Sequence, residues 1–243
     1  MLAVAGYAPS AWAQARAPSK APAPTLERQN QQILDELKAI RQLLEKLAAQ
    51  PAPAPEADVK VALKAEPGDY AMGKADAPLT MVEFTDLECP FCRRFHVETF
   101  DRIKRAYIDT GKLRYVSRDF PLPFHPQAEA AAKAARCAGE QNKFWEMRHA
   151  ILMNNAKLAA DSFTTFAQDL QLNTSAFAAC VADTARHTAA LQADRASASI
   201  AGVNGTPGFV LGRTRAGGVD GIRIVGAQPF DVFDAHIKQA LTQ

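Results

Sequence analysis

The sequence lacks the features that mark several large functional classes. Its 243 residues contain no run of Lys or Arg, and the formal net charge at pH 7 is only +2. A nucleic-acid-binding domain presents a basic stripe to phosphates, so we expect no nucleic-acid partner. The patterns of serine hydrolases (Gly-x-Ser-x-Gly) and of phosphate-binding glycine loops are also missing. No segment approaches 18 uninterrupted apolar residues, so we expect a soluble mature protein.

The sequence also lacks the usual ligand spacing of a metal centre. Its five histidines show no His-Glu-x-x-His pattern. Cys89 and Cys92 form a Cys-x-x-Cys pair, but zinc needs two more ligands, and only His96 follows nearby. We therefore predict no metal site, while transient copper(I) binding by the reduced pair stays open.

Cysteine is scarce, and the placement of its four residues is informative. Cys89 and Cys92 are close together, whereas Cys137 and Cys180 are isolated. Four cysteines permit three pairings, and only the pairing of Cys89 with Cys92 keeps a redox motif intact. That leaves Cys137 and Cys180 as a candidate structural disulfide, which requires an oxidising compartment. Whether these two residues are bonded is left open at this stage.

The N-terminus is consistent with export. Residues 1–13 are apolar, too short to span a bilayer, and end in small-x-small tripeptides, so we predict a signal peptide over residues 1–15. No Lys or Arg precedes the apolar run, which leaves open a leader that begins further upstream. An Ala-rich disordered tail is the alternative. We expect a periplasmic or secreted protein.

A helix is predicted over residues 26–50, between a linker at 16–25 and a Pro/Ala linker at 51–58 whose prolines cannot continue it. Its heptad positions are Leu26, Ile33, Ile40 and Leu47 at d, and Asn30, Leu37 and Leu44 at a. Leu at a with Ile at d favours trimers or tetramers over dimers. We therefore predict an oligomerisation helix that resembles a coiled coil, and an amphipathic helix folded back on its own domain is the alternative.

The remaining residues, 59–243, show the alternating pattern of an α/β domain. Strands are predicted over residues 59–63, 79–85, 112–119, 205–212 and 221–225, and helices over 90–110, 125–200 and 229–241. The long helical stretch interrupts the strand–helix alternation. We therefore predict an α/β core with a helical insertion at about residues 125–200.

The Cys-x-x-Cys motif follows a predicted strand and opens a helix. Pro90 suits the first helical position, so Cys89 lies at the helix N-terminus, where free N–H groups and the dipole stabilise a thiolate. Cys92 is one turn further on and on the same side, close enough for a short disulfide. Cys89 is therefore the candidate nucleophile, and Cys92 is the candidate resolving thiol.

Two other positions bear on this site. Glu83 lies six residues before Cys89 within an apolar strand. If it is buried, it can exchange a proton with Cys92, but a solvated strand face is equally open. Thr206-Pro207 stands between glycines, where a cis bond would let the Thr206 backbone pair with a substrate. A plain turn is the alternative for this dipeptide.

These segments resemble the thioredoxin superfamily, and within it the DsbA-like branch with its helical insertion. The matching stretches are VEFTDLECPFCRRF, YVSRDFPL, AARCAGEQNKFWEM, NGTPGF and VGAQPF. The resemblance implies a thioredoxin-like core, protein substrates with disulfides or thiols, a DsbD-like or DsbB-like membrane redox partner, and no cofactor. The site residues that it implies are Cys89 as nucleophile, Cys92 as resolving cysteine, Glu83 as buried acid, Thr206-Pro207 as cis-proline loop, and a second pair at Cys137 and Cys180.

Two departures from that family pattern shift the expected role. Pro90-Phe91 replaces the Pro-His of strongly oxidising members, so Cys89 loses one source of thiolate stabilisation and the centre should be a weaker oxidant. The predicted oligomerisation helix and Thr206 resemble the disulfide isomerases and copper-tolerance-associated relatives. We therefore predict a disulfide isomerase or reductase; the alternatives are a disulfide oxidase and a copper- or client-binding thiol protein.

Overall fold

The computed structural model describes residues 25–48 and 59–242. The chain divides into two compact units between Glu56 and Ala57. The predicted signal peptide at residues 1–15 lies outside the described residues, as does the linker at 51–58. Within the part of the chain that is described, no helix is both long and apolar enough to cross a membrane.

The first unit contains one long helix, α1 (Leu26–Ala48). Glu27 in its first turn and Lys46 in its last turn complement the helix dipole. At least half of the surface of each large apolar side chain is exposed, namely Leu26, Ile33, Leu34, Leu37, Ile40, Leu43 and Leu44. The predicted helix is confirmed, with its described end at Ala48, and self-association through it stays a prediction.

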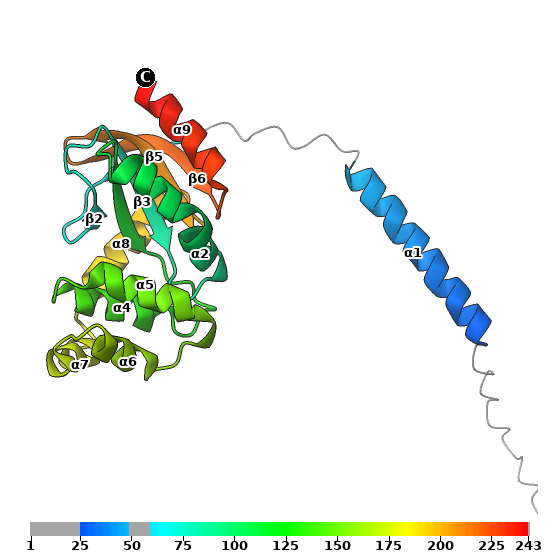
Figure 1. Ribbon diagram of the computed structural model, residues 1–243, viewed down its shortest axis with the longest axis horizontal. Helices are drawn as coiled ribbons and strands as arrows, with labels where there is room; N and C mark the ends of the chain where they lie inside the picture. Colours follow the sequence, from blue (N-terminus) through cyan, green and yellow to red (C-terminus); the bar gives the residue numbers. More distant parts are fainter. Residues whose placement is uncertain (1–24, 49–58, 243) are drawn as a thin grey trace, which may run out of the picture. The chain divides into compact units, whose positions relative to one another are not determined.

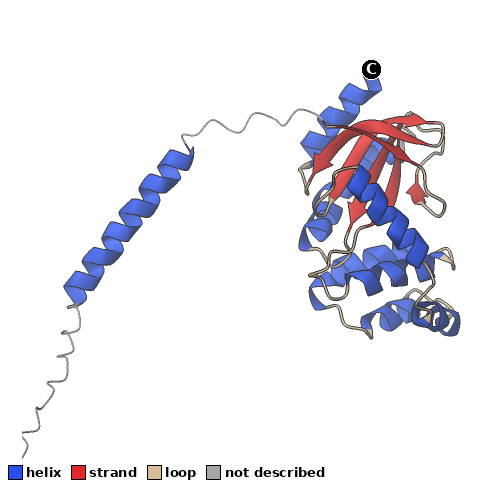
Figure 2. Ribbon diagram, turned by 180° about the vertical axis from the view of Figure 1, so that it is seen from behind, coloured by secondary structure: helices blue, strands red, loops and turns tan. Residues whose placement is uncertain are grey.

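The second unit is built on a six-stranded mixed sheet with the strand order β1-β6-β5-β3-β4-β2. The strands are β1 (Lys60–Lys64), β2 (Tyr70–Met72), β3 (Leu79–Thr85), β4 (Leu113–Asp119), β5 (Gly208–Arg215) and β6 (Gly218–Val225). β3 and β4 are parallel, and the other neighbouring strands are antiparallel. Every residue of β3 is buried, because helices cover both faces of the sheet (Figure 2).

On one face of the sheet lie a continuous helical segment and the C-terminal helix. They are α2 (Pro90–Phe95), η1 (His96–Phe100), α3 (Asp101–Ile103), η2 (Lys104–Ile108) and α9 (Phe230–Thr242). Phe95, Phe209 and Phe233 pack their rings together between these helices and the sheet. On the other face lies α8 (Thr188–Ile200), whose Ala198 belongs to the same apolar cluster as Val82 of β3.

A helical layer stands at one end of the sheet (Figure 1). It consists of α4 (Ala128–Gly139), α5 (Phe144–Asn154), η3 (Asn155–Lys157), α6 (Ser162–Asp169) and α7 (Thr174–Ala182). Cys137 on α4 and Cys180 on α7 form a disulfide with a Cα–Cα distance of 5.8 Å. The apolar core of this layer extends to Cys89 and Cys92, so the insertion packs directly against the Cys-x-x-Cys motif.

A buried network of ion pairs joins the insertion to the sheet. Arg136 of α4 donates from Nε to Asp119 Oδ2 at the end of β4 (2.6 Å) and from Nη2 to Asp194 Oδ2 on α8 (2.5 Å). Burial, and after it the charge of Asp119, raise the pKa of Asp194 to about 7 against the opposing charge of Arg136. The single guanidinium therefore holds two carboxyl groups from two different layers.

The predicted α/β fold with a helical insertion is confirmed, and two details differ. The sequence did not predict β2, because its three residues are too few to show alternation. The sequence placed α8 inside the insertion at 125–200, but α8 packs on the sheet, so the insertion proper comprises α4 to α7. The predicted helix stop is present as Gly111, which has a left-handed φ of 75°.

Candidate active site

Cys89 is the N-cap residue of α2, at the turn that leaves the buried strand β3. Its φ and ψ of −68° and 125° are extended, and Pro90 takes the first helical position. The Cys89 N–H donates to Asp86 O (3.1 Å), and its carbonyl accepts from Asn155 Nδ2 (3.0 Å). These bonds fix the backbone so that the Cys89 side chain lies at the positive end of the helix dipole.

The Cys89 thiol is strongly acidified. Its pKa is lowered to about 5, first by a hydrogen bond with the Cys92 side chain and then by the Thr206 side chain and the backbone N–H groups of Cys92 and Phe91, while burial opposes the shift. All of these groups favour the charged form of the sulfur. At neutral pH Cys89 is therefore a thiolate, the form that attacks disulfides.

Cys92 has the opposite environment. Its side chain is completely buried, and both active-site cysteines are unbonded thiols. Burial raises the pKa of Cys92 well above its ordinary value, and the neighbouring Cys89 and the charge of Glu83 raise it further. Cys92 therefore keeps its proton at neutral pH and must lose it before it can act as a nucleophile.

Glu83 lies in the middle of β3 and is completely buried, so the alternative of a solvated strand face is wrong. Its Oε2 accepts hydrogen bonds from Arg148 Nη2 (2.7 Å) and from the Tyr115 hydroxyl. Its Oε1 has no hydrogen-bond partner among the described residues. Burial raises the pKa of Glu83, and the Arg148 charge works against that rise. A buried carboxyl with one free oxygen is suited to accept a proton.

Arg148 comes from α5 of the insertion and is itself held by a histidine pair. Its Nη1 lies 3.4 Å from His96 Nδ1, and His96 Nε2 lies 2.9 Å from His149 Nδ1. Arginine only donates, so His96 Nδ1 accepts and its Nε2–H donates to His149. Burial lowers the pKa of His96 to about 3, with the charges of Arg148 and His149 acting in the same sense, so His96 is neutral at physiological pH.

The loop before β5 lies directly against the nucleophile. The Thr206–Pro207 peptide bond is cis. Cys89 Sγ donates to the Thr206 carbonyl at 3.4 Å. The Thr206 hydroxyl is buried and has no other partner among the residues described, so it is available as a donor to the Cys89 thiolate.

A second loop, between β4 and α4, is tied to the active-site turn by carboxylates. Asp86 Oδ2 accepts from Leu122 N and binds His125 Nδ1, both at 2.8 Å. Glu88 Oε2 accepts from Gln127 N at 2.6 Å. The turn that carries Cys89 is therefore positioned by the insertion as well as by the sheet.

A groove of about 770 Å³ opens beside the motif. Its walls include Phe91, Phe95 and Phe230 as apolar surface and Thr206 at the end nearest Cys89. Phe91 is 53% exposed, which is high for an aromatic side chain. The groove therefore combines apolar surface with the charged residues Arg94, Glu98 and Arg102 next to the acidified thiol.

The structure brings Cys89, Cys92, Glu83 and the Thr206-Pro207 loop into one site, whereas the bonded pair Cys137–Cys180 lies within the insertion. Three residues escaped the sequence analysis: Arg148, Tyr115 and Asn155. No signal in the sequence pointed to Arg148, since it stands beside His149 and close to Glu146 in α5 and so resembles an ordinary polar position of that helix.

Comparison with known proteins supports the fold. A family model described as Thioredoxin matches residues 65–222. Among solved structures, Wolbachia pipientis alpha-DsbA1 superposes with a TM-score of 0.66 at 24% identity, covering 74% of this chain and 94% of that one. Oxidised BdbD from Bacillus subtilis gives a TM-score of 0.62 at 19% identity, covering 75% of this chain and 100% of that one. At these identities the likeness establishes the fold alone.

Similar curated proteins fall into two groups. A Na⁺/H⁺ antiporter NhaA 3 from Salinispora tropica is 32% identical over 166 residues, or 68% of this chain. This chain spans only 25% of that antiporter. A Rickettsia conorii protein, provisionally named a protein-disulfide oxidoreductase, is 36% identical over 101 residues, covering 42% of this chain and 36% of that protein.

Proposed function

Because this chain belongs to the thioredoxin family of thiol–disulfide oxidoreductases, we propose that it exchanges disulfides with protein substrates. The observation that carries the proposal is the unequal acidity of its two thiols. The pKa of Cys89 is about 5, whereas burial holds the pKa of Cys92 well above its ordinary value. Cys89 is therefore a thiolate that can attack a disulfide, and Cys92 stays a protonated thiol until the mixed disulfide has formed. Thiol–disulfide exchange requires these two roles.

In the proposed reaction the Cys89 thiolate attacks one sulfur of a substrate disulfide. A mixed disulfide forms, and the other substrate sulfur leaves as a thiolate. Glu83 then accepts the proton of Cys92, whose sulfur attacks Cys89 and releases the reduced substrate. The substrate disulfide gains two electrons and the Cys89–Cys92 pair loses two, so a membrane redox partner or another donor must reduce the pair again.

The favoured direction is isomerisation or reduction. The pKa of Cys89, about 5, lies between the values of about 7 in thioredoxin and about 3.5 in the strong oxidant DsbA, so this acidity fits either direction and the preference rests on Phe91. A less stabilised thiolate makes a weaker oxidant. The exposed Phe91 agrees with this, because it places an apolar ring where strongly oxidising relatives have an imidazole.

The groove beside the motif supports a protein substrate. Its volume of about 770 Å³ and its walls, which combine aromatic side chains with Arg94, Glu98 and Arg102, suit an extended, unfolded segment of a protein. The Thr206 carbonyl, now bonded to Cys89 Sγ, would accept from the substrate backbone once the thiol has lost its proton. The groove thus presents a substrate disulfide to the attacking sulfur.

Assembly through α1 and an exported location complete the proposal. The exposed apolar side chains of α1 follow a heptad spacing that favours trimers or tetramers. A disulfide such as the one inside the insertion persists in an oxidising compartment, such as the periplasm or the cell exterior. An assembly presents several grooves to one misoxidised client.

Two measurements test this function. The chain should restore activity to scrambled ribonuclease, and its Cys89–Cys92 potential should lie closer to the roughly −270 mV of thioredoxin than to the roughly −120 mV of DsbA. A potential near about −120 mV, with oxidation of reduced ribonuclease but no rescue of the scrambled form, would instead establish an oxidase. The oxidase is the second candidate, because similar solved structures carry the name DsbA.

Replacing Leu37 with Glu on α1 tests the assembly. A buried charge at an a position should dissociate the oligomer and lower isomerase activity while disulfide reduction by the isolated motif is kept. Gln42→Glu is the matched control, since Gln42 lies at an outer heptad position. If light scattering gives the same mass for the parent and for Leu37→Glu, the assembly through α1 is excluded.

A further inference from the structure

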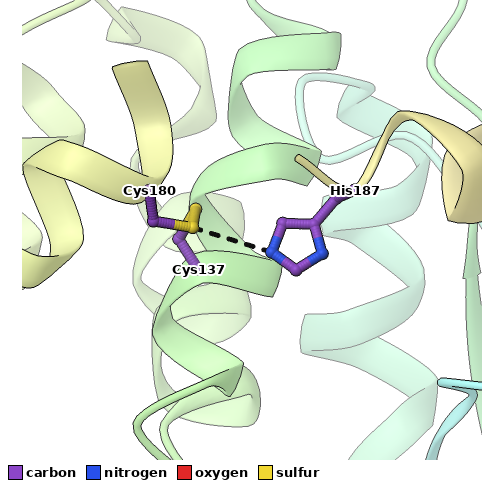
Figure 3. A group of neighbouring side chains, drawn as sticks. All are labelled: Cys137, Cys180 and His187. Carbon is purple, nitrogen blue, oxygen red and sulfur yellow. Dashed lines mark hydrogen bonds between the residues drawn. A yellow bond between two sulfur atoms is a disulfide. The ribbon is translucent and has the colours of Figure 1, made fainter. Parts of the chain in front are cut away.

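Few buried side-chain oxygen or nitrogen atoms lack a hydrogen-bond partner in the described part of the chain. In the insertion, for example, His187 Nε2 lies 3.6 Å from Cys180 Sγ (Figure 3) and 3.1 Å from Glu140 Oε1. Two atoms of β3 differ, because neither the Thr85 hydroxyl nor Glu83 Oε1 has an aligned partner among the described residues. A buried polar atom without a partner is costly, so two of them close to reactive thiols need an explanation.

Thr85 and Glu83 lie on the same face of the sheet. Side chains two residues apart in a strand point the same way, and the face of β3 that carries Met81 packs against Phe95 of α2. Thr85 is the last residue of β3 and is only 1% exposed. It is therefore two positions nearer than Glu83 to the turn that carries the Cys-x-x-Cys motif.

The Thr85 side chain acts on both groups that exchange a proton in the proposed function. Its hydroxyl is close enough to Glu83 and to Cys92 to favour the charged form of each, and it lowers the pKa of both. Glu83, in contrast, raises the pKa of Cys92 through its charge. The hydrogen bonds that Glu83 accepts within the described residues come from Arg148 and Tyr115, and both end on Oε2. Glu83 Oε1 is thus left for Thr85.

We propose that Thr85 is a catalytic residue whose hydroxyl carries the proton from Cys92 to Glu83 Oε1 during the resolving step. This inference deepens the exchange function proposed above and rests on it. The Cys92 S–H gives its proton to Thr85 Oγ1 while the Thr85 O–H gives its own proton to Glu83, so the hydroxyl is regenerated. The Cys92 sulfur then bonds to Cys89, the bond from Cys89 to the substrate breaks, and the substrate sulfur leaves as a thiolate.

The two steps of the exchange can be timed separately in the full chain. The reduced protein is mixed with enough oxidised glutathione for the mixed disulfide to accumulate, quenched with acid at set times and analysed by mass spectrometry. Growth of the mixed disulfide reports the attack by Cys89. Its decay to the chain with a Cys89–Cys92 disulfide reports the resolving step by Cys92.

Thr85→Val removes the hydroxyl and keeps the shape of the side chain. It should slow the decay of the mixed disulfide by about 100-fold, the size of a general acid–base contribution, and leave its formation unchanged. Thr85→Ser keeps a hydroxyl and should restore the decay rate. Thr80→Val is the matched control, because Thr80 is a buried residue on the opposite face of the same strand. This control should match the parent in both steps.

Stability measurements separate the relay from a structural role. Thr85→Val should unfold at a urea concentration no lower than the parent does, because the hydroxyl that it removes is buried without an aligned partner. If this variant does not fold, Thr85→Ala takes its place with the same expected slowing. Adding Glu83→Gln to Thr85→Val should slow the decay little further, because the two residues act in one proton transfer.

The outcomes distinguish the relay from the exchange function on which it rests. A decay rate in Thr85→Val equal to that of the parent would overturn the relay. If Glu83→Gln alone then slowed the decay, the exchange function would stand, with direct transfer to Glu83. A decay in Thr85→Ser as slow as in Thr85→Val would also overturn the relay. A parent chain that forms no mixed disulfide would overturn the exchange function and the relay together.

Discussion

Replacing Arg148 with Met should show how strongly the Arg148 charge lowers the pKa of Glu83. The guanidinium lies 2.7 Å from the Glu83 carboxylate, and both side chains are almost fully buried. At an effective dielectric constant of about 20, charges about 4 Å apart interact by about 4 kcal/mol. The pKa of Glu83, which burial already raises, should therefore rise further in the variant, because the opposing charge of Arg148 is gone.

The direction of the pH effect follows from this shift. A carboxyl whose pKa is raised on folding favours the folded state at low pH, and that contribution is lost as the pH rises through the folded pKa. Removal of Arg148 raises the folded pKa of Glu83 and leaves the unfolded value unchanged. The loss of stability should therefore be small near pH 4, and it should grow by up to about 1.4 kcal/mol per pH unit once the pH exceeds the folded pKa of Glu83 in the parent.

Urea unfolding of the oxidised chain at pH 4 and pH 8 measures the effect, because neither Cys89 nor Cys92 titrates when they are bonded. The destabilisation by Arg148→Met should be about 2–4 kcal/mol larger at pH 8 than at pH 4. Arg105→Met, at an exposed position of η2, should stay within about 0.5 kcal/mol of the parent at both pH values. Adding Glu83→Gln to Arg148→Met should remove the pH dependence. An equal loss at both pH values would refute the electrostatic account.

Three further outcomes are expected. Alkylation of reduced Cys89 by iodoacetamide should be half-maximal at pH about 5, and a midpoint above pH 8 would contradict the acidified thiol. Phe91→His should lower that midpoint and raise the redox potential, because an imidazolium beside Cys89 stabilises its thiolate; a potential that does not change would count against the role given to Phe91. Cys137→Ala combined with Cys180→Ala should lower the free energy of unfolding by about 4 kcal/mol, because the disulfide closes a loop across 43 residues and restricts the unfolded chain. Thermal unfolding measures this loss. A loss below about 1 kcal/mol would mean that the insertion is stable without the disulfide.

The parts of the fold that local patterns encode could be predicted from the sequence. The mostly apolar segment at residues 79–85, with Glu83 embedded in it, predicted a strand, and β3 spans those same residues. Pro90 after Cys89 predicted a helix start, because proline suits the first helical turn. Long-range relations had no such local trace. The sequence of α8 resembles that of the inserted helices. Its apolar face packs on the sheet, and this contact is visible only in the folded structure.

The site divides in the same way. Cys89, Cys92 and Pro90 are close in sequence, and a thiol at a helix N-terminus is acidified by its position, so the sequence alone predicted Cys89 as the attacking sulfur. Glu83 is buried because helices cover both faces of the sheet at β3, and the alternation of residues within the strand could not show this.

Only the tertiary structure decided which groups complete the centre. Arg148 follows Glu83 by 65 residues and Thr206 follows Cys89 by 117, and each meets its partner solely because the insertion and the sheet pack together. The sequence by itself determined the reactive motif, the helix that presents it and the heptad helix before it. The tertiary structure decided how acidic the thiols are and that Glu83 is buried, because those properties depend on burial and on charges brought from distant segments of the chain.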